Sequence, residues 1–234
     1  LITQFETSVN IKEEEQTTNR TGLFRKSDAE VIGDDEQKRM VMARANAYGQ
    51  RSATLLNEDC DGPVSLYVTL HGCSEKAVDS ICALGAKDLR RTDPGYAGAG
   101  IYTTFQAEYA ALYSKERSVI ILCCCAASNI YPISRSMDYE EPYDSVYYDD
   151  YGRAAHSRFF DKKNGMARKP GFDAHWFCVT QPDRNDMNDV QCYVPGDDRF
   201  PPCYDELVVK EEKQVLPIAV VHIGAPRVRK DGFR

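Results

Sequence analysis

An apolar run of nine residues, Val119 to Ala127, constrains the fold of this chain more than any other feature. The run contains three consecutive cysteines, Cys123 to Cys125, and no charged residue. Because it is apolar at both odd and even positions, it fits a β-strand that is buried on both faces. It is far shorter than the roughly 20 residues that a membrane-spanning helix needs. We therefore expect a central strand of a sheet.

Strand signals lie on both sides of this run. The segment 66–70 is rich in β-forming residues, and later strand signals cover 172–179, 206–209 and 215–223. No helical pattern separates the last of these strands. This order favours an α+β fold with mainly antiparallel pairing over a doubly wound parallel sheet.

Three segments have helical patterns. Residues 34–56 have helical composition, and Ser74 and Gly85 are placed to bound a second helix with one apolar face. Thr103 and Gln106 match a capping box ahead of a third helix. That helix would align four apolar side chains on one face: Phe105, Tyr109, Leu112 and Tyr113.

The chain of 234 residues is long enough for one large domain. We expect residues 1–60 to form a polar extension that contains the first helix, residues 61–226 to form the main domain, and residues 227–234 to form a basic tail. The segment 138–151 is acidic and rich in tyrosine, which is typical of a long surface loop.

Charge and cysteine usage limit the classes of partner. The formal net charge of −7 disfavours broad electrostatic binding of DNA or RNA. The nine cysteines include no C-x-x-C pair, so we expect no zinc or other metal site. Three consecutive cysteines are poor geometry for a disulfide framework. Buried free thiols in the cytoplasm or nucleus are the preferred interpretation, and a secreted protein with some disulfides is the alternative.

Three motifs of candidate catalytic or ligand-binding residues follow one another along the chain. A His-Gly pair at 71–72 ends the first strand, Tyr102 follows a glycine-rich turn, and Glu206 opens a late strand. Tyr109 and Tyr113 lie 7 and 11 positions after Tyr102, on one predicted helix.

This order resembles the catalytic domain of the poly(ADP-ribose) polymerase-like, diphtheria-toxin-like ADP-ribosyltransferases, over about residues 62–224. The family's signature is a His-Gly, a Gly-x-Tyr before a tyrosine-bearing helix, and a Glu that opens a late strand. The resemblance implies split, mainly antiparallel β-sheets flanked by helices, with NAD as the substrate. The chain departs from the signature at Ala110, where the family usually has a serine that bonds the nicotinamide carboxamide.

The resemblance also implies a role for each motif residue. His71 would hydrogen-bond a ribose hydroxyl of NAD, and the backbone of Gly72 would hydrogen-bond the nicotinamide carboxamide. Tyr113 would stack on the nicotinamide ring, and Tyr102 would lie on its other side. Glu206 would stabilise the oxocarbenium-like ribose that forms as the glycosidic C–N bond breaks.

The roles expected of residues beside these motifs are less specific. Arg90 either meets the NAD pyrophosphate or forms a surface ion pair. We expect Tyr109 to be a packing residue and Asp205 to be a neighbour of Glu206 with a modest role. His175 and Trp176, inside a strand signal, are expected to pack in the core.

The sequence leaves three functions open. The leading hypothesis is transfer of ADP-ribose from NAD to a protein side chain, with mono-ADP-ribosylation favoured and a nucleic-acid acceptor disfavoured. The second is an NAD glycohydrolase, in which water is the acceptor. The third is a catalytically inactive member of the same fold that binds a partner.

Overall fold

The computed structural model describes residues 2–7, 9–10, 35–57, 64–86, 100–114, 119–133, 160–161, 165–166, 171–181, 191–192 and 201–223. Three sequence-based predictions fall outside these residues: the role of Arg90, the surface loop at 138–151 and the basic tail at 227–234.

The strands form one mainly antiparallel sheet in the order β10-β3-β1-β2-β9-β7-β4, with β8 paired to β7. Their bounds are β1 Ser65–Gly72, β2 Ile101–Thr104, β3 Val119–Ala127, β4 Ile130–Pro132, β7 Ala174–Thr180, β8 Gln191–Cys192, β9 Tyr204–Val209 and β10 Val215–His222. The pair β4–β7 is parallel. A separate hairpin joins β5 (Phe160–Asp161) to β6 (Gly165–Met166). The expected α+β class with mainly antiparallel pairing is confirmed.

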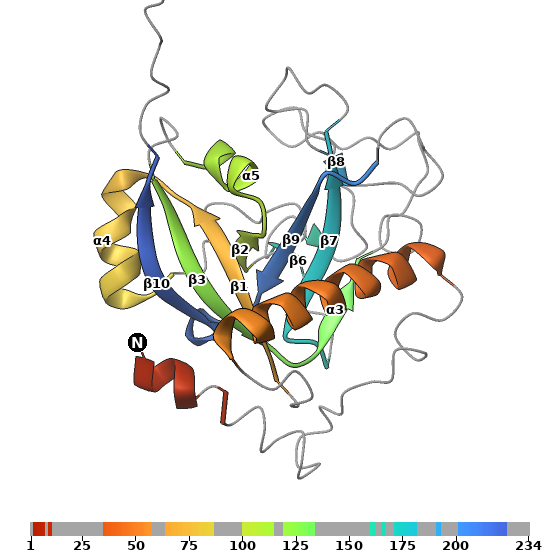
Figure 1. The fold of residues 1–234 in the computed structure, drawn as a ribbon, viewed down its shortest axis with the longest axis horizontal. Coiled ribbons are helices and arrows are strands. Elements are labelled where there is room, and N and C mark those ends of the chain that lie inside the picture. Colours follow the sequence, from red (N-terminus) through yellow and green to blue (C-terminus); the bar gives the residue numbers. More distant parts are fainter. Residues whose placement is uncertain are drawn as a thin grey trace, which may run out of the picture.

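The apolar run forms β3, between β10 and β1, as expected of an interior strand. All of its residues except Leu122 are buried. The sheet is much less continuous between β1 and β2. Strand β1 pairs with β3 over its whole length, whereas within the described residues its register with β2 is the one pair Leu70↔Thr104. Two half-sheets, β10-β3-β1 and β2-β9-β7-β4, diverge from this junction (Figure 1).

Helix α3 (Glu36–Leu56) confirms the helix expected at 34–56 and crosses both half-sheets, where it contacts β1, β4 and β7 (Figure 1). The Asp35 side chain caps its start by accepting from the Lys38 N–H, 3.1 Å away. Helix α4 (Glu75–Leu84) lies between Ser74 and Gly85 as expected. The Ser74 side chain makes no capping hydrogen bond. The expectation that this side chain caps α4 is therefore wrong.

The third helix, α5 (Ala107–Leu112), is shorter than the sequence pattern predicts. The expected capping box is wrong, because Thr103 lies in β2 and its hydroxyl donates to the Leu207 carbonyl, 3.1 Å away. Phe105 precedes the helix and packs against the rings of Tyr48 and Trp176, with centroids 4.1 and 4.8 Å away. Pairing of β2 with β9 and this aromatic stack therefore override the local helical pattern.

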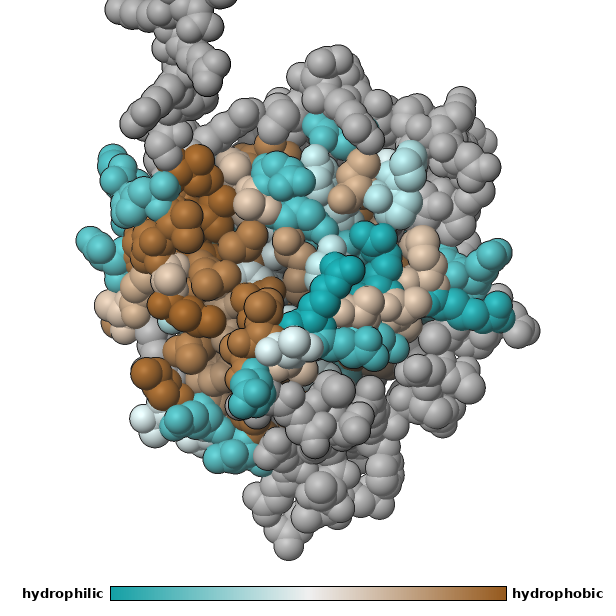
Figure 2. Space-filling view, in the orientation of Figure 1, coloured by the Kyte–Doolittle hydropathy of each residue, from teal (hydrophilic) through white to brown (hydrophobic). Residues whose placement is uncertain are grey.

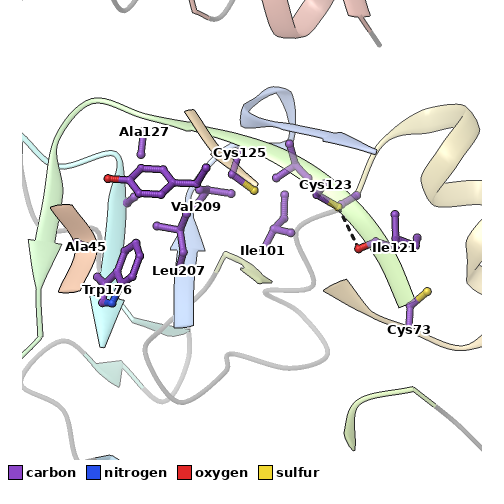
Figure 3. Close-up of a cluster of buried hydrophobic side chains, with 14 of the residues drawn as sticks. Ala45, Cys73, Ile101, Ile121, Cys123, Cys125, Ala127, Trp176, Leu207 and Val209 are labelled. Carbon is purple, nitrogen blue, oxygen red and sulfur yellow. Dashed lines mark hydrogen bonds between the residues drawn. The ribbon is translucent and has the colours of Figure 1, made fainter. Parts of the chain in front are cut away.

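Two apolar clusters cover opposite faces of the sheet. The first, drawn in part in Figure 3, joins α3 to the strands and includes Ala45, Ile101, Cys125, Trp176 and Leu207. The second lies against β9 and β7 on the opposite face and includes Tyr109, Phe177 and Val208. Trp176 and His175 are both fully buried, as expected of core residues.

A third apolar surface stays exposed over the β10-β3-β1 half-sheet (Figure 2). Ile218 and Val221, both on β10, are about half exposed. Short helical stretches at residues 2–7 and 9–10 contribute Phe5 and Val9, which join the cluster around Cys124. Strand β10 is an edge strand, and its register with β3 shifts between Pro217 and Ala219.

Candidate active site

The junction of the two half-sheets brings the three motifs together. Leu70 of β1 is in register with Thr104 of β2, and Thr104 is in register with Glu206 of β9. His71 follows Leu70 directly, and Tyr102 lies two residues before Thr104. Segments that are far apart in the sequence therefore meet on three neighbouring strands.

His71 is held by the backbone of the second motif. Its Nδ1 lies 2.8 Å from the carbonyl oxygen of Tyr102. A carbonyl can only accept, so Nδ1 carries the proton and donates. Burial lowers the pKa of His71, and the hydrogen bond to the Tyr102 carbonyl opposes this shift in part. The imidazole is therefore neutral at pH 7, with Nε2 as a hydrogen-bond acceptor for a group such as a hydroxyl.

Gly72 lies directly beneath α5. A Cβ built on Gly72 would come within 1.9 Å of the Ala110 carbonyl oxygen and 3.1 Å of the Tyr113 Cβ. Any side chain at this position would collide with the helix backbone. Glycine at position 72 is therefore required by the close approach of α5, which places Tyr113 beside the His-Gly motif.

Two tyrosines of the α5 segment reach Glu206. The hydroxyls of Tyr109 and Tyr113 lie 2.9 Å apart, and both phenols lower the pKa of the Glu206 carboxyl, as hydrogen bonding to its ionised form does. Their rings are nearly perpendicular, with centroids 5.4 Å apart. Tyr113 thus lies beside the glycine of the first motif, and its phenol lowers the pKa of the glutamate of the third.

The two tyrosines differ in exposure. Tyr109 is 2% exposed and stacks on Tyr204, with ring centroids 4.6 Å apart. Tyr113 is 54% exposed, although it takes part in the same hydrogen-bonded group. The expectation that Tyr109 packs in the core is confirmed, and its phenol also lowers the pKa of Glu206, which the sequence did not predict. The exposed ring of Tyr113 offers an aromatic face that a planar ligand could stack on.

Glu206 titrates in an unusual range. It is 4% exposed, and burial raises the pKa of its carboxyl from 4.5 to about 7, although the hydrogen bonds from Tyr109 and Tyr113 lower it. Burial raises the pKa of the Tyr109 phenol, and the nearby charge of Glu206 raises it further. A carboxyl whose pKa lies near neutrality is suited to acid–base or electrostatic work.

Tyr102 contributes its side chain to the same face as Glu206. It packs against the cluster of Tyr109 and Val208, and it is partly buried. Along β9, Tyr204, Glu206 and Val208 face this cluster, while Leu207 and Val209 face the cluster on the α3 side. This alternation follows from the two-residue period of a strand.

Asp205 lies on the α3 side of β9 and is fully buried. Both of its carboxylate oxygens accept from Arg44 of α3, with Nε at 2.7 Å and Nη2 at 2.5 Å. Sequence reasoning gave Asp205 a modest role and found no site residue in 1–60. A signal did exist, since an aspartate that alternates with apolar strand residues on the core side needs a buried cation.

Metal-ligand clusters and membrane-spanning helices are both absent from the part of the chain that the structure describes. No group of three or more His, Cys, Asp or Glu side chains there is arranged to hold a metal ion. No described helix is long and apolar enough to cross a membrane.

The arrangement combines a near-neutral carboxyl, two phenols, a neutral imidazole and an exposed aromatic ring within one junction. Such a set can bind a polar ring system and place negative charge beside a developing cation. The chain matches no model of a known protein family and no curated protein sequence.

Proposed function

We propose that this chain is the catalytic domain of an NAD-dependent ADP-ribosyltransferase. One observation carries the proposal: Leu70, which precedes His71, is in register with Thr104, and Thr104 is in register with Glu206. The His-Gly, Gly-x-Tyr and Glu motifs, which the resemblance treats as one site, therefore meet in space.

Each residue has a defined task in the proposed reaction. His71 accepts a hydrogen bond from a ribose hydroxyl of NAD through Nε2, which matches its Nδ1-protonated, neutral form. The exposed ring of Tyr113 stacks on the nicotinamide. Tyr102 closes the site from β2, and the backbone of Gly72 bonds the carboxamide.

The ionised carboxylate of Glu206 stabilises the ribose as it becomes cationic. The glycosidic C–N bond breaks, and nicotinamide leaves with the bonding electron pair. The acceptor then donates a lone pair to the same ribose carbon and loses its proton to Glu206 or to solvent. Little covalent work falls to the protein, so positioning and charge supply most of the rate enhancement.

We further propose that the sheet is the split sheet of the family. Within the described residues, β1 and β2 share one register pair, and the two halves of the sheet diverge there. Arg90 is proposed to meet the NAD pyrophosphate, and we favour mono-ADP-ribosylation of a protein in the cytoplasm or nucleus.

Two other functions use the same residues. An NAD glycohydrolase needs the same cleavage with water as acceptor. An inactive, partner-binding member is favoured by Ala110, which lacks the hydroxyl that the family uses on the carboxamide. Losing one neutral hydrogen bond costs about 0.5–1.5 kcal/mol, which weakens NAD binding without abolishing it.

The products distinguish these functions. The protein is incubated with NAD that carries a label on its adenylate half, together with candidate acceptor proteins. Label on protein indicates transfer, and free ADP-ribose as the sole product indicates hydrolysis. NAD that raises the melting temperature without being consumed indicates an inactive binding member. Absence of both NAD consumption and thermal stabilisation would remove the proposal.

A further inference from the structure

Helix α3 lies outside the segment that resembles the transferase family, yet it contacts the residue next to Glu206. Arg44 donates to both carboxylate oxygens of Asp205, from Nε at 2.7 Å and from Nη2 at 2.5 Å. Asp205 has no exposed surface, and the Arg44 side chain is 31% exposed. A two-pronged guanidinium contact fixes direction as well as distance, which a lysine ammonium cannot do.

The other polar groups of Asp205 are held as well. The Trp176 indole N–H donates to its carboxylate at 3.2 Å. Gln106 accepts from the Asp205 N–H at 3.1 Å, and the Thr104 hydroxyl donates to the Asp205 carbonyl at 2.7 Å. Main chain and side chain at position 205 are therefore constrained from β2, β7 and α3 together.

Helix α3 is itself fixed to both half-sheets. Lys38 donates to the Tyr131 hydroxyl of β4 at 2.7 Å, and the Ser52 hydroxyl accepts from the Val68 N–H of β1 at 2.9 Å. Near Arg44, the Tyr48 hydroxyl accepts from the Gln106 amide at 2.7 Å. Because Arg44 belongs to this anchored helix, its contact with Asp205 holds β9 in a fixed position relative to both half-sheets.

We propose that α3 belongs to the catalytic unit and that Arg44 is a positioning residue for Glu206. This inference rests on the proposed function, since it names a residue that serves the same site. Side chains of 205 and 206 point to opposite faces of β9, so fixing one sets the direction of the other. Arg44 and Asp205 hold the strand, and Tyr109 and Tyr113 then meet the carboxyl on the far side.

Stability alone does not account for such a pair. Replacement of a buried ion pair by uncharged groups is often neutral or stabilising, so its presence is weak evidence for a role in stability. A misplacement of about 1 Å, by contrast, can cost about 100-fold in rate. The pair is thus better suited to fixing geometry than to adding stability.

The test uses the double variant Arg44→Met/Asp205→Asn. It removes both charges at once, and the new amide oxygen still accepts from the Trp176 indole. Single variant Arg44→Lys keeps the charge and loses the two-pronged contact. Arg51→Met, an exposed position on the same helix, is the matched control. Two quantities are measured on each folded variant: NAD turnover, and the titration of the Glu206 carboxyl by carbon-13 NMR.

For the double variant we expect kcat to fall about 100-fold, with KM for NAD changed less than about twofold. Arg44→Lys should lie between wild type and the double variant. The Glu206 titration should move from near pH 7 towards that of an ordinary carboxyl as the side chain leaves its buried position. Arg51→Met should match wild type in both measurements.

A folded double variant with wild-type kcat and a wild-type Glu206 titration would overturn the inference. If the double variant does not fold, Arg44→Lys decides by the same two measurements. If the wild-type protein does not turn over NAD, the proposed function fails, and the titration alone still decides whether Arg44 positions Glu206.

Discussion

The buried carboxyl of Glu206 should make the protein less stable as pH rises, and Glu206→Gln should remove this effect. Folding raises the pKa of this carboxyl from 4.5 to about 7. The folded state therefore binds more protons than the unfolded state between these values, so the free energy of unfolding falls as pH rises through that window. At 1.36 kcal/mol for each pH unit, the full loss above pH 8 is about 3 kcal/mol.

A glutamine cannot ionise, so the variant escapes this loss. We expect the melting temperature of Glu206→Gln, minus that of wild type, to grow between pH 5 and pH 8.5. The free-energy change over this interval is about 2.5 kcal/mol, which corresponds to about 5–10 °C for a domain of this size. The variant gains stability at high pH while it loses the group that is proposed to stabilise the cationic ribose.

Thermal unfolding of both proteins at half-unit steps of pH measures this difference. Glu108→Gln is the control, because Glu108 is exposed on the same α5 that carries Tyr109. For the control, the melting-temperature difference should stay constant with pH. A constant difference for Glu206→Gln as well would show that the carboxyl is not buried in the way described.

Four further results are expected. The value of kcat/KM for NAD should rise with pH through about 7, because the proposed mechanism uses the carboxylate form of Glu206, and a rate that falls over this range would contradict that role. Gly72→Ala should destabilise the protein by about 1–3 kcal/mol in urea unfolding and lower NAD turnover, because its Cβ would lie 1.9 Å from a carbonyl oxygen of α5. Gly49→Ala, where the nearest atom is 3.4 Å away, should instead stabilise α3 by about 0.5–1 kcal/mol, and equal effects at both glycines would refute the packing argument. Cys82, which is exposed, should react quickly with a thiol reagent, whereas Cys125, whose pKa burial raises to about 11, should react only after unfolding.

Local patterns in the sequence predicted much of the sheet. The nine-residue apolar run became the interior strand β3, and the His-Gly motif does end β1. Helix α4 lies between its two expected cap residues, Ser74 and Gly85. These features depend on short-range periodicity and on glycine's access to positive φ, such as the value of 88° at Gly85. Short-range chemistry of this kind is readable from a single chain.

Features that depend on distant partners were not predictable in the same way. Arg44 pairs with a residue 161 positions away, and its helical segment has no local motif that points to this contact. Thr103 and Phe105 match the start of a helix. In the structure Thr103 instead pairs with β9, and Phe105 stacks on Trp176. Tyr109 has the spacing of a core residue, and only the register of β2 with β9 brings Glu206 within its reach.

The proposed function requires that His71, Tyr102, Tyr113 and Glu206 together cleave NAD at its nicotinamide bond. The decisive measurement is the release of nicotinamide over time, followed by chromatography for wild type and Glu206→Gln. We expect steady release by wild type and none above background by the variant, while NAD raises the melting temperature of both proteins. Equal release from both proteins, or no release and no thermal stabilisation with either, would contradict it.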